Sequence, residues 1–190
     1  MKNRRIIPLT IMLAVLAALS IGCAQNRQGD TSPGTTPSET TPDVTTTASI
    51  VDNAEDFKKA ISRTGTWIIC LTKDLTLNEE IVLDGEFTNG KKDEQGQDII
   101  QRKIALYTQD ENRNVTARFT LTAPKLTINS PNARIQSGTF KGDIYVSAEN
   151  FELVDAVVDG NVYFTTDKAK STFKMDEKSS VSGKQELVQE

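Results

Sequence analysis

The chain has 190 residues, of which 22 are basic and 26 acidic, so its formal charge is −4. It contains no histidine, which excludes catalysis by an imidazole base and any metal site with a histidine ligand. The acidic balance, without a long basic stretch to follow a phosphate backbone, argues against nucleic acid as a partner.

The first 22 residues have the layout of a secretory signal peptide. Lys2, Arg4 and Arg5 precede a mostly apolar run over residues 6–21, and polar residues follow this run. A basic start, an apolar centre and small residues at the end are typical of export signals. We therefore predict that residues 1–22 direct export and are then removed.

The signal-like segment ends in a cysteine. The ending LSIGC at 19–23 resembles the lipobox of bacterial lipoproteins, with Gly22 as the small residue before Cys23. This resemblance implies acyl chains such as palmitate on Cys23, and a protein anchored to a membrane at the bacterial cell surface or periplasmic face. Two or three acyl chains give stable attachment, which one chain does not. The alternative is an ordinary signal peptide cut near Ala18 or Ala24.

A polar tether is predicted at 23–49, after the lipidated cysteine. Residues 24–49 include eight threonines and three prolines, and Val44 is their only branched aliphatic residue. Such a composition buries too little apolar surface to offset the entropy of ordering, so we expect disorder. Without residues 1–22 the chain has 19 basic and 26 acidic residues, a charge of −7 that should hold it away from an anionic membrane.

A short amphipathic helix opens the predicted folded domain, residues 50–190. Asp52 or Asn53 can cap its N-terminus, and Gly65 suits the left-handed turn that often follows a helix. Three apolar residues recur on one face at helical spacing: Phe57, Ala60 and Ile61. After this helix the apolar period changes to two. There Cys70, within an apolar run, is expected to be a small buried side chain.

Two six-residue phrases lie 18 residues apart and are nearly the same: KGDIYV at 141–146 and DGNVYF at 159–164. Other short apolar triplets recur at intervals of 18 to 25 residues, and the best match aligns 119–121 with 144–146. This periodicity predicts a unit of three short strands that repeats through the domain.

The alternation within each phrase predicts an inner and an outer face. Ile144 and Val162 are expected in a stacked interior. Tyr145 and Tyr163 are expected to stack on the outer face, where they would form an aromatic platform. The glycine of each phrase marks the same sharp corner in successive units.

Five coils closed by an N-terminal helix resemble the right-handed parallel β-helix of the pectate-lyase-like superfamily. The resemblance covers residues 50–190 and rests on strand rhythm and the capping helix, so it implies an all-β fold and no particular activity. The second coil is expected to contain Phe87, residues 104–106 and Val115. The alternative all-β fold is an antiparallel β-sandwich, which also has many short strands.

The insertion at 84–103 is the predicted ligand or cation loop. Carboxylate oxygens in it could bind calcium, and two basic residues could meet an acidic sugar. The residues concerned are Asp93, Glu94, Asp98, Arg102 and Lys103. The plain alternative is a solvated loop of mixed charge. No catalytic residue and no further metal or cofactor site is assigned.

Two functions follow from these expectations. The first is a non-catalytic surface lipoprotein that has a structural role or binds a glycan, a cell-wall polymer or a protein. The second is a small calcium-assisted polysaccharide lyase. The first is favoured because the sequence has no adjacent pair of aspartates and no histidine, which hydrolases of the resembled superfamily use.

Overall fold

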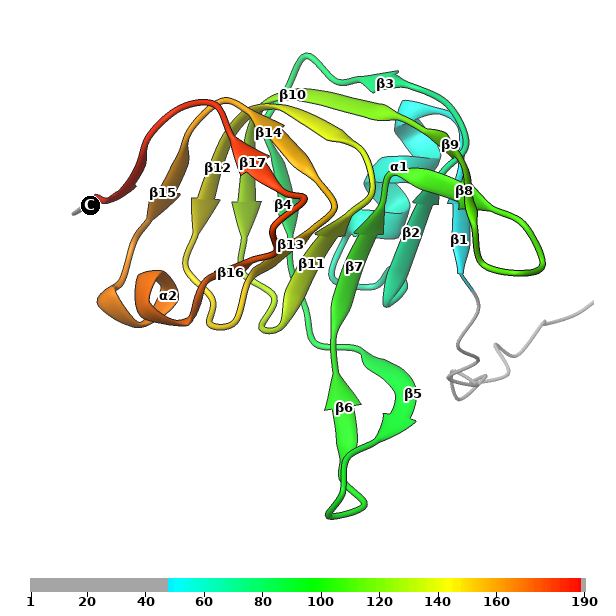
Figure 1. The fold of residues 1–190 in the computed structure, drawn as a ribbon, viewed down its shortest axis with the longest axis horizontal. Coiled ribbons are helices and arrows are strands. Elements are labelled where there is room, and N and C mark those ends of the chain that lie inside the picture. The colour runs from blue at the N-terminus through cyan, green and yellow to red at the C-terminus, as the bar shows by residue number, and fades with distance from the viewer. Residues whose placement is uncertain (1–47, 189–190) are drawn as a thin grey trace, which may run out of the picture. The chain divides into compact units, whose positions relative to one another are not determined.

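The structure is a computed structural model that describes residues 48–188 (Figure 1). The predicted signal peptide, Cys23 and nearly all of the predicted tether lie outside the described residues. The first strand begins at Ser49, one residue before the predicted start of the domain.

Sheet A is one of two large sheets, and each of its strands runs parallel to its neighbours. Its six strands, in spatial order, are β1 (Ser49–Val51), β2 (Ile68–Leu71), β7 (Arg102–Ala105), β11 (Ala133–Gln136), β13 (Glu152–Val154) and β16 (Lys174–Met175). Partner residues lie 18 to 35 positions apart along the chain, so the sheet grows by one strand each time the chain returns.

Sheet B has two arms that share two long strands, β10 (Thr120–Ile128) and β12 (Thr139–Val146). The first arm adds β3 (Leu75–Thr76), β14 (Val157–Asp159) and β17 (Ser180–Val181). The second arm adds β4 (Ile81–Leu83), β15 (Val162–Phe164) and β18 (Gln185–Leu187). All pairs are parallel, and the register between β10 and β12 shifts at the corner that joins the arms.

Two hairpins leave the strand β7, one before it and one after it. They consist of β5 (Thr88–Lys92) with β6 (Asp98–Ile100), and of β8 (Tyr107–Gln109) with β9 (Val115–Arg118). Figure 1 shows the β5–β6 hairpin standing away from the two large sheets. These hairpins are the antiparallel elements of the described residues. The predicted all-β class is therefore confirmed, whereas parallel pairing in both large sheets makes the antiparallel sandwich wrong.

The core consists of inward side chains that stack from strand to strand. Leu126, Ile144 and Val162 are consecutive partners in the second arm, and each has 0% of its surface exposed. A similar buried row crosses sheet A through Ile69, Ile104, Ile135 and Leu153. The predicted parallel neighbourhood of Ile144 and Val162 is confirmed.

The predicted alignment of residues 119–121 with 144–146 has the wrong register. The partner of Ile144 in β10 is Leu126, 18 residues earlier, whereas Leu121 pairs with Phe140. The error arises because β10 and β12 pass through the corner between the arms without an intervening loop. The repeat is therefore shorter here than the 25 residues that matched triplets suggested.

The second predicted coil is also only partly correct. Residues 104–106 are buried in the core, as expected. Val115 instead belongs to the β8–β9 hairpin and is 38% exposed, and Phe87 precedes the β5–β6 hairpin. Cys70 points outward from β2 and is half-buried, between the inward Ile69 and Leu71. Burial raises the pKa of its thiol, and the charge of nearby Lys103 opposes this effect.

The predicted helix is present as α1 (Ala54–Ile61), and its three predicted apolar residues are buried. Asn53 is the cap, since its Oδ1 accepts a hydrogen bond from the Asp56 amide at 2.9 Å. Gly65 is not in the left-handed turn that was predicted, because the helix ends at Ile61 with Ser62 as its C-cap. A Cβ on Gly65 would lie 2.0 Å from the Ala60 carbonyl oxygen, so close backbone approach requires glycine here. A second helix, α2 (Asp167–Thr172), follows β15.

The stacking predicts that two adjacent residues respond differently to the same change. Val162→Asp places a carboxylate in the apolar interior and should lower the free energy of unfolding by several kcal/mol. Tyr163→Asp changes an outward position and should cost about 1 kcal/mol. Urea denaturation followed by circular dichroism would measure both, and equal losses would contradict the inward–outward alternation.

Candidate functional site

Most acidic residues of the predicted loop help to form the β5–β6 hairpin. Asp93 Oδ1 accepts hydrogen bonds from the backbone amides of Gln95 and Gln97, at 2.9 and 2.8 Å. Asp98 Oδ1 lies 2.9 Å from Lys92 Nζ across the hairpin. Glu94 is exposed in the turn. The loop is therefore an ordered hairpin in which two of the three carboxylates have protein partners.

Asp93 and Asp98 also line an open groove of about 590 Å³ between this hairpin and strands β13 and β16. The groove includes two further charged residues, Glu152 and Lys174. Glu152 Oε2 lies 2.7 Å from Arg134 Nη2, so its charge is already compensated. Across residues 48–188 no three acidic or cysteine side chains are grouped so as to hold a metal ion.

Arg102 lies elsewhere, fully buried at the start of β7. Its guanidinium donates hydrogen bonds to four backbone carbonyls and lies 4.1 Å from the centre of the Phe87 ring. The four acceptors are the carbonyl oxygens of Ala60 (2.7 Å), Ser62 (2.9 Å), Thr66 (2.9 Å) and Asp84. Arg102 is therefore not available to an acidic sugar, contrary to the prediction.

The acceptors explain why an arginine is buried at this place. The carbonyls of Ala60 and Ser62 lie at the C-terminal end of α1, where helix carbonyls lack partners within the helix and carry partial negative charge. Burial lowers the pKa of Arg102 to about 10, and nearby Asp84 opposes this shift. At neutral pH the guanidinium is still charged and joins α1 to the start of β2 and to the segment after β4.

Lys103, the next residue, points to the opposite side of the strand and is half-buried. Its Nζ donates a hydrogen bond to Tyr107 Oη at 3.0 Å and lies 5.1 Å from the centre of the Tyr107 ring. Neither Arg102 nor Lys103 lines the groove beside Asp93 and Asp98. The five residues of the predicted ligand loop therefore do not converge on one site.

The two predicted platform tyrosines do lie together. Tyr145 and Tyr163 are partners on β12 and β15, with ring centres 4.9 Å apart and ring planes inclined by 44°. They belong to an outward row of consecutive partners across the second arm, which we call the tyrosine row: Val82, Thr127, Tyr145, Tyr163 and Glu186.

Lys125 fixes one end of the tyrosine pair. Its Nζ lies 4.7 Å from the centre of the Tyr145 ring and 3.4 Å from Glu80 Oε2. A lysine over the face of an aromatic ring is attracted by the negative potential of that face. This contact was not predicted, because Lys125 is one strand away from Tyr145 and its place depends on the register between β10 and β12.

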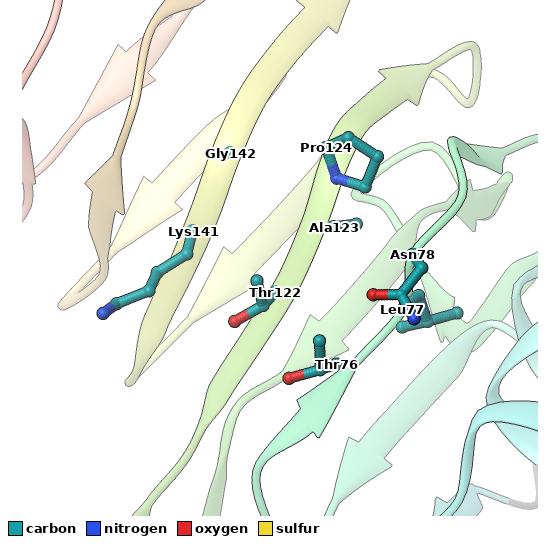
Figure 2. A pocket seen from close by; sticks show the side chains of 8 residues that line it. All are labelled: Thr76, Leu77, Asn78, Thr122, Ala123, Pro124, Lys141 and Gly142. Atoms are coloured by element: carbon teal, nitrogen blue, oxygen red, sulfur yellow. The ribbon is translucent and has the colours of Figure 1, made fainter.

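A shallow groove of about 470 Å³ follows the corner between the two arms (Figure 2). Thr76, Thr122 and Lys141 are successive partners on β3, β10 and β12, and their side chains extend to the same side. The other lining residues are Leu77, Asn78, Ala123, Pro124 and Gly142.

Glycine allows the strands to approach each other closely at this corner. Gly142 has φ +133°, and a Cβ there would lie 1.9 Å from the Ala123 carbonyl oxygen. A Cβ on Gly160, one strand further on, would lie 2.0 Å from the Gly142 carbonyl oxygen. The glycines of the two repeated phrases therefore form one corner, as predicted. Backbone packs on backbone there, and the surface beside the tyrosine row stays open.

The outer face of sheet B brings aromatic and polar side chains together beside a groove. It has two neighbouring aromatic rings, hydroxyl and amide side chains, and a groove alongside them. Aromatic rings stack on apolar faces of a ligand, while polar side chains set its orientation. This surface is therefore the candidate functional site.

The buried guanidinium of Arg102 leads to a stability prediction. Arg102→Met leaves four carbonyls without their donor and should lower the free energy of unfolding by about 3–5 kcal/mol. Arg102→Lys should recover only part of this loss, because one ammonium cannot reach all four acceptors. The matched control is Lys103→Met, which changes the outward neighbour and should cost about 1 kcal/mol. Chemical denaturation would compare the three, and equal losses at both positions would refute the role of Arg102.

No helix within residues 48–188 has the length and apolar character needed to cross a membrane. In comparisons of the chain with known proteins, no protein-family model, no curated protein and no solved structure matches it.

Proposed function

We propose that the chain is an exported lipoprotein, anchored to a membrane through lipid on Cys23, whose folded domain binds a glycan or cell-wall polymer without cleaving it. The observation that carries the binding proposal is the pair formed by Tyr145 and Tyr163, with ring centres 4.9 Å apart on an outward row. The anchor proposal rests on the sequence at 1–23 alone.

We also propose that the domain is a right-handed parallel β-helix of five coils. The support is the order of pairing: from β2 onward the chain visits sheet A, then the first arm of sheet B, then the second arm, and returns to sheet A one strand further on. Helix α1 supports the proposal as well, because it contacts β1, β2 and β4 and buries its apolar face there. A coil of this kind needs cover over its first strands.

The alternative of a calcium-assisted lyase has weaker support. It needs carboxylates and basic residues around one groove, whereas Arg102 is held by backbone carbonyls and Lys103 by Tyr107. In the groove beside this hairpin, the negative charges of Asp98 and Glu152 are compensated by Lys92 and Arg134. A binding role uses the outer face of sheet B and requires no such convergence.

The anchor can be tested with the two cysteines of the chain. Cys23→Ser removes the thiol that would accept the lipid, and we expect the protein to lose its acyl mass and its membrane attachment. Cys70→Ser is the matched control, because Cys70 lies half-buried on β2, and it should retain the lipid. Mass spectrometry and membrane fractionation in a bacterial host would measure both. A wild-type chain without acyl mass would disprove the anchor.

The binding role can be tested on a broad glycan and cell-wall polymer array. We expect Tyr145→Ala and Tyr163→Ala each to weaken binding of any captured polymer by about tenfold, because each removes half of the aromatic surface. Tyr107→Ala is the matched control, since it removes the tyrosine that contacts Lys103 on a separate hairpin. Equal effects of all three substitutions, or no captured polymer at all, would argue against the proposal.

A further inference from the structure

The tyrosine row has a regular spacing that runs across the strands. Hydrogen-bonded strands lie about 4.8 Å apart, so the five positions of the row extend over about 19 Å. The two tyrosine rings follow this step, with centres 4.9 Å apart. The two aromatic rings therefore lie side by side across the strands, and a ligand that contacts both must also lie across them.

The charges of this face are internally balanced. Each of three lysines in or beside its strands has a carboxylate within 4 Å. Lys125 pairs with Glu80 at 3.4 Å, Lys141 with Asp159 at 3.8 Å, and Lys184 with Glu186 at 3.4 Å. Asp143 adds a negative charge and accepts a hydrogen bond from the Asn161 amide at 2.8 Å. An acidic polymer would have to break these ion pairs and would meet a small excess of carboxylates.

Hydroxyl groups of the face remain available to a ligand. Thr76 and Thr122 line the corner groove, and Thr127 precedes Tyr145 in the tyrosine row. No hydrogen bond within residues 48–188 engages any of these three hydroxyls. A hydroxyl can both donate and accept, so it suits the hydroxyl groups of a neutral sugar.

From this spacing and charge balance we infer that the ligand is a neutral, extended glycan that lies across the strands, with about one sugar over each strand. This inference rests on the proposed glycan-binding function and specifies its ligand. Sugars of an extended chain contact the exposed parts of the Tyr145 and Tyr163 rings, and their hydroxyls bond to Thr127 and to the polar side chains beside the corner groove.

The test is calorimetric titration of the full chain, held in a detergent without a sugar headgroup. The probes are neutral β-1,4-linked oligomers of glucose and of N-acetylglucosamine, from disaccharide to hexasaccharide, and α-1,4-linked galacturonic acid oligomers of the same lengths. We expect at least one neutral series to bind, with affinity that rises at least tenfold from disaccharide to pentasaccharide and then levels off. Added sodium chloride should leave this affinity unchanged within about twofold, because no net charge is neutralised.

Variants test whether the glycan affinity depends on the tyrosine row. Tyr145→Ala and Tyr163→Ala should each weaken pentasaccharide binding by about tenfold and disaccharide binding less, whereas Tyr107→Ala should change neither. Circular dichroism of each variant checks that the fold is retained. A Tyr163→Phe variant retains the ring and should bind as the wild type does.

Each contrary outcome has a distinct meaning. Stronger binding of the acidic series, with affinity that falls as salt is added, overturns the neutral ligand and leaves a glycan-binding function in place. Neutral binding without length dependence overturns the arrangement across the strands. Failure of all three series overturns the inference, and the broader array then decides whether the proposed function survives.

Discussion

Parallel pairing in register is the constraint on which the other features of the domain depend. It places each side chain beside its equivalent in the next strand, so that Leu126, Ile144 and Val162 form one buried row. The same register creates outward rows, because the residue after each buried one must point away. The same register therefore determines which side chains form the core and which form the surface. A shift by one residue would turn Val162 outward and Tyr163 inward.

A stack of parallel strands leaves its first strands uncovered. Here helix α1 covers them, and the buried charge of Arg102 holds the helix in place. Helix α1 brings three apolar residues to that end, but its C-terminal carbonyls need donors. Arg102 supplies them, although it arises more than 40 residues later, at the start of β7. Desolvation of the guanidinium costs free energy, which four carbonyl bonds and the Phe87 ring offset. Helix α1 and strand β7 are thereby joined.

The sequence predicted those features that depend on local pattern. The helix, the buried apolar positions and the shared corner of the two repeated phrases follow from residue type and period. The register between β10 and β12 did not follow, because these strands cross the corner without a loop and shorten the repeat. The role of Arg102 was missed because its partners are backbone carbonyls, which carry no sequence signal. Tyr145 and Tyr163 were found because their spacing equals one repeat, whereas Lys125 depends on the corrected register.

The outer tyrosines contribute to the sheet and to the candidate site through the same contacts. A cross-strand aromatic pair stabilises a sheet by about 0.2–1 kcal/mol, and here Lys125 also restrains the ring of Tyr145. Both effects reduce the motion of the rings before any ligand arrives. A ligand that stacks on a surface already ordered loses less entropy than one that must order it. The parallel register thus supplies a pre-ordered pair of aromatic rings, while the interior behind it, at Ile144 and Val162, supplies the stability that holds the pair in place.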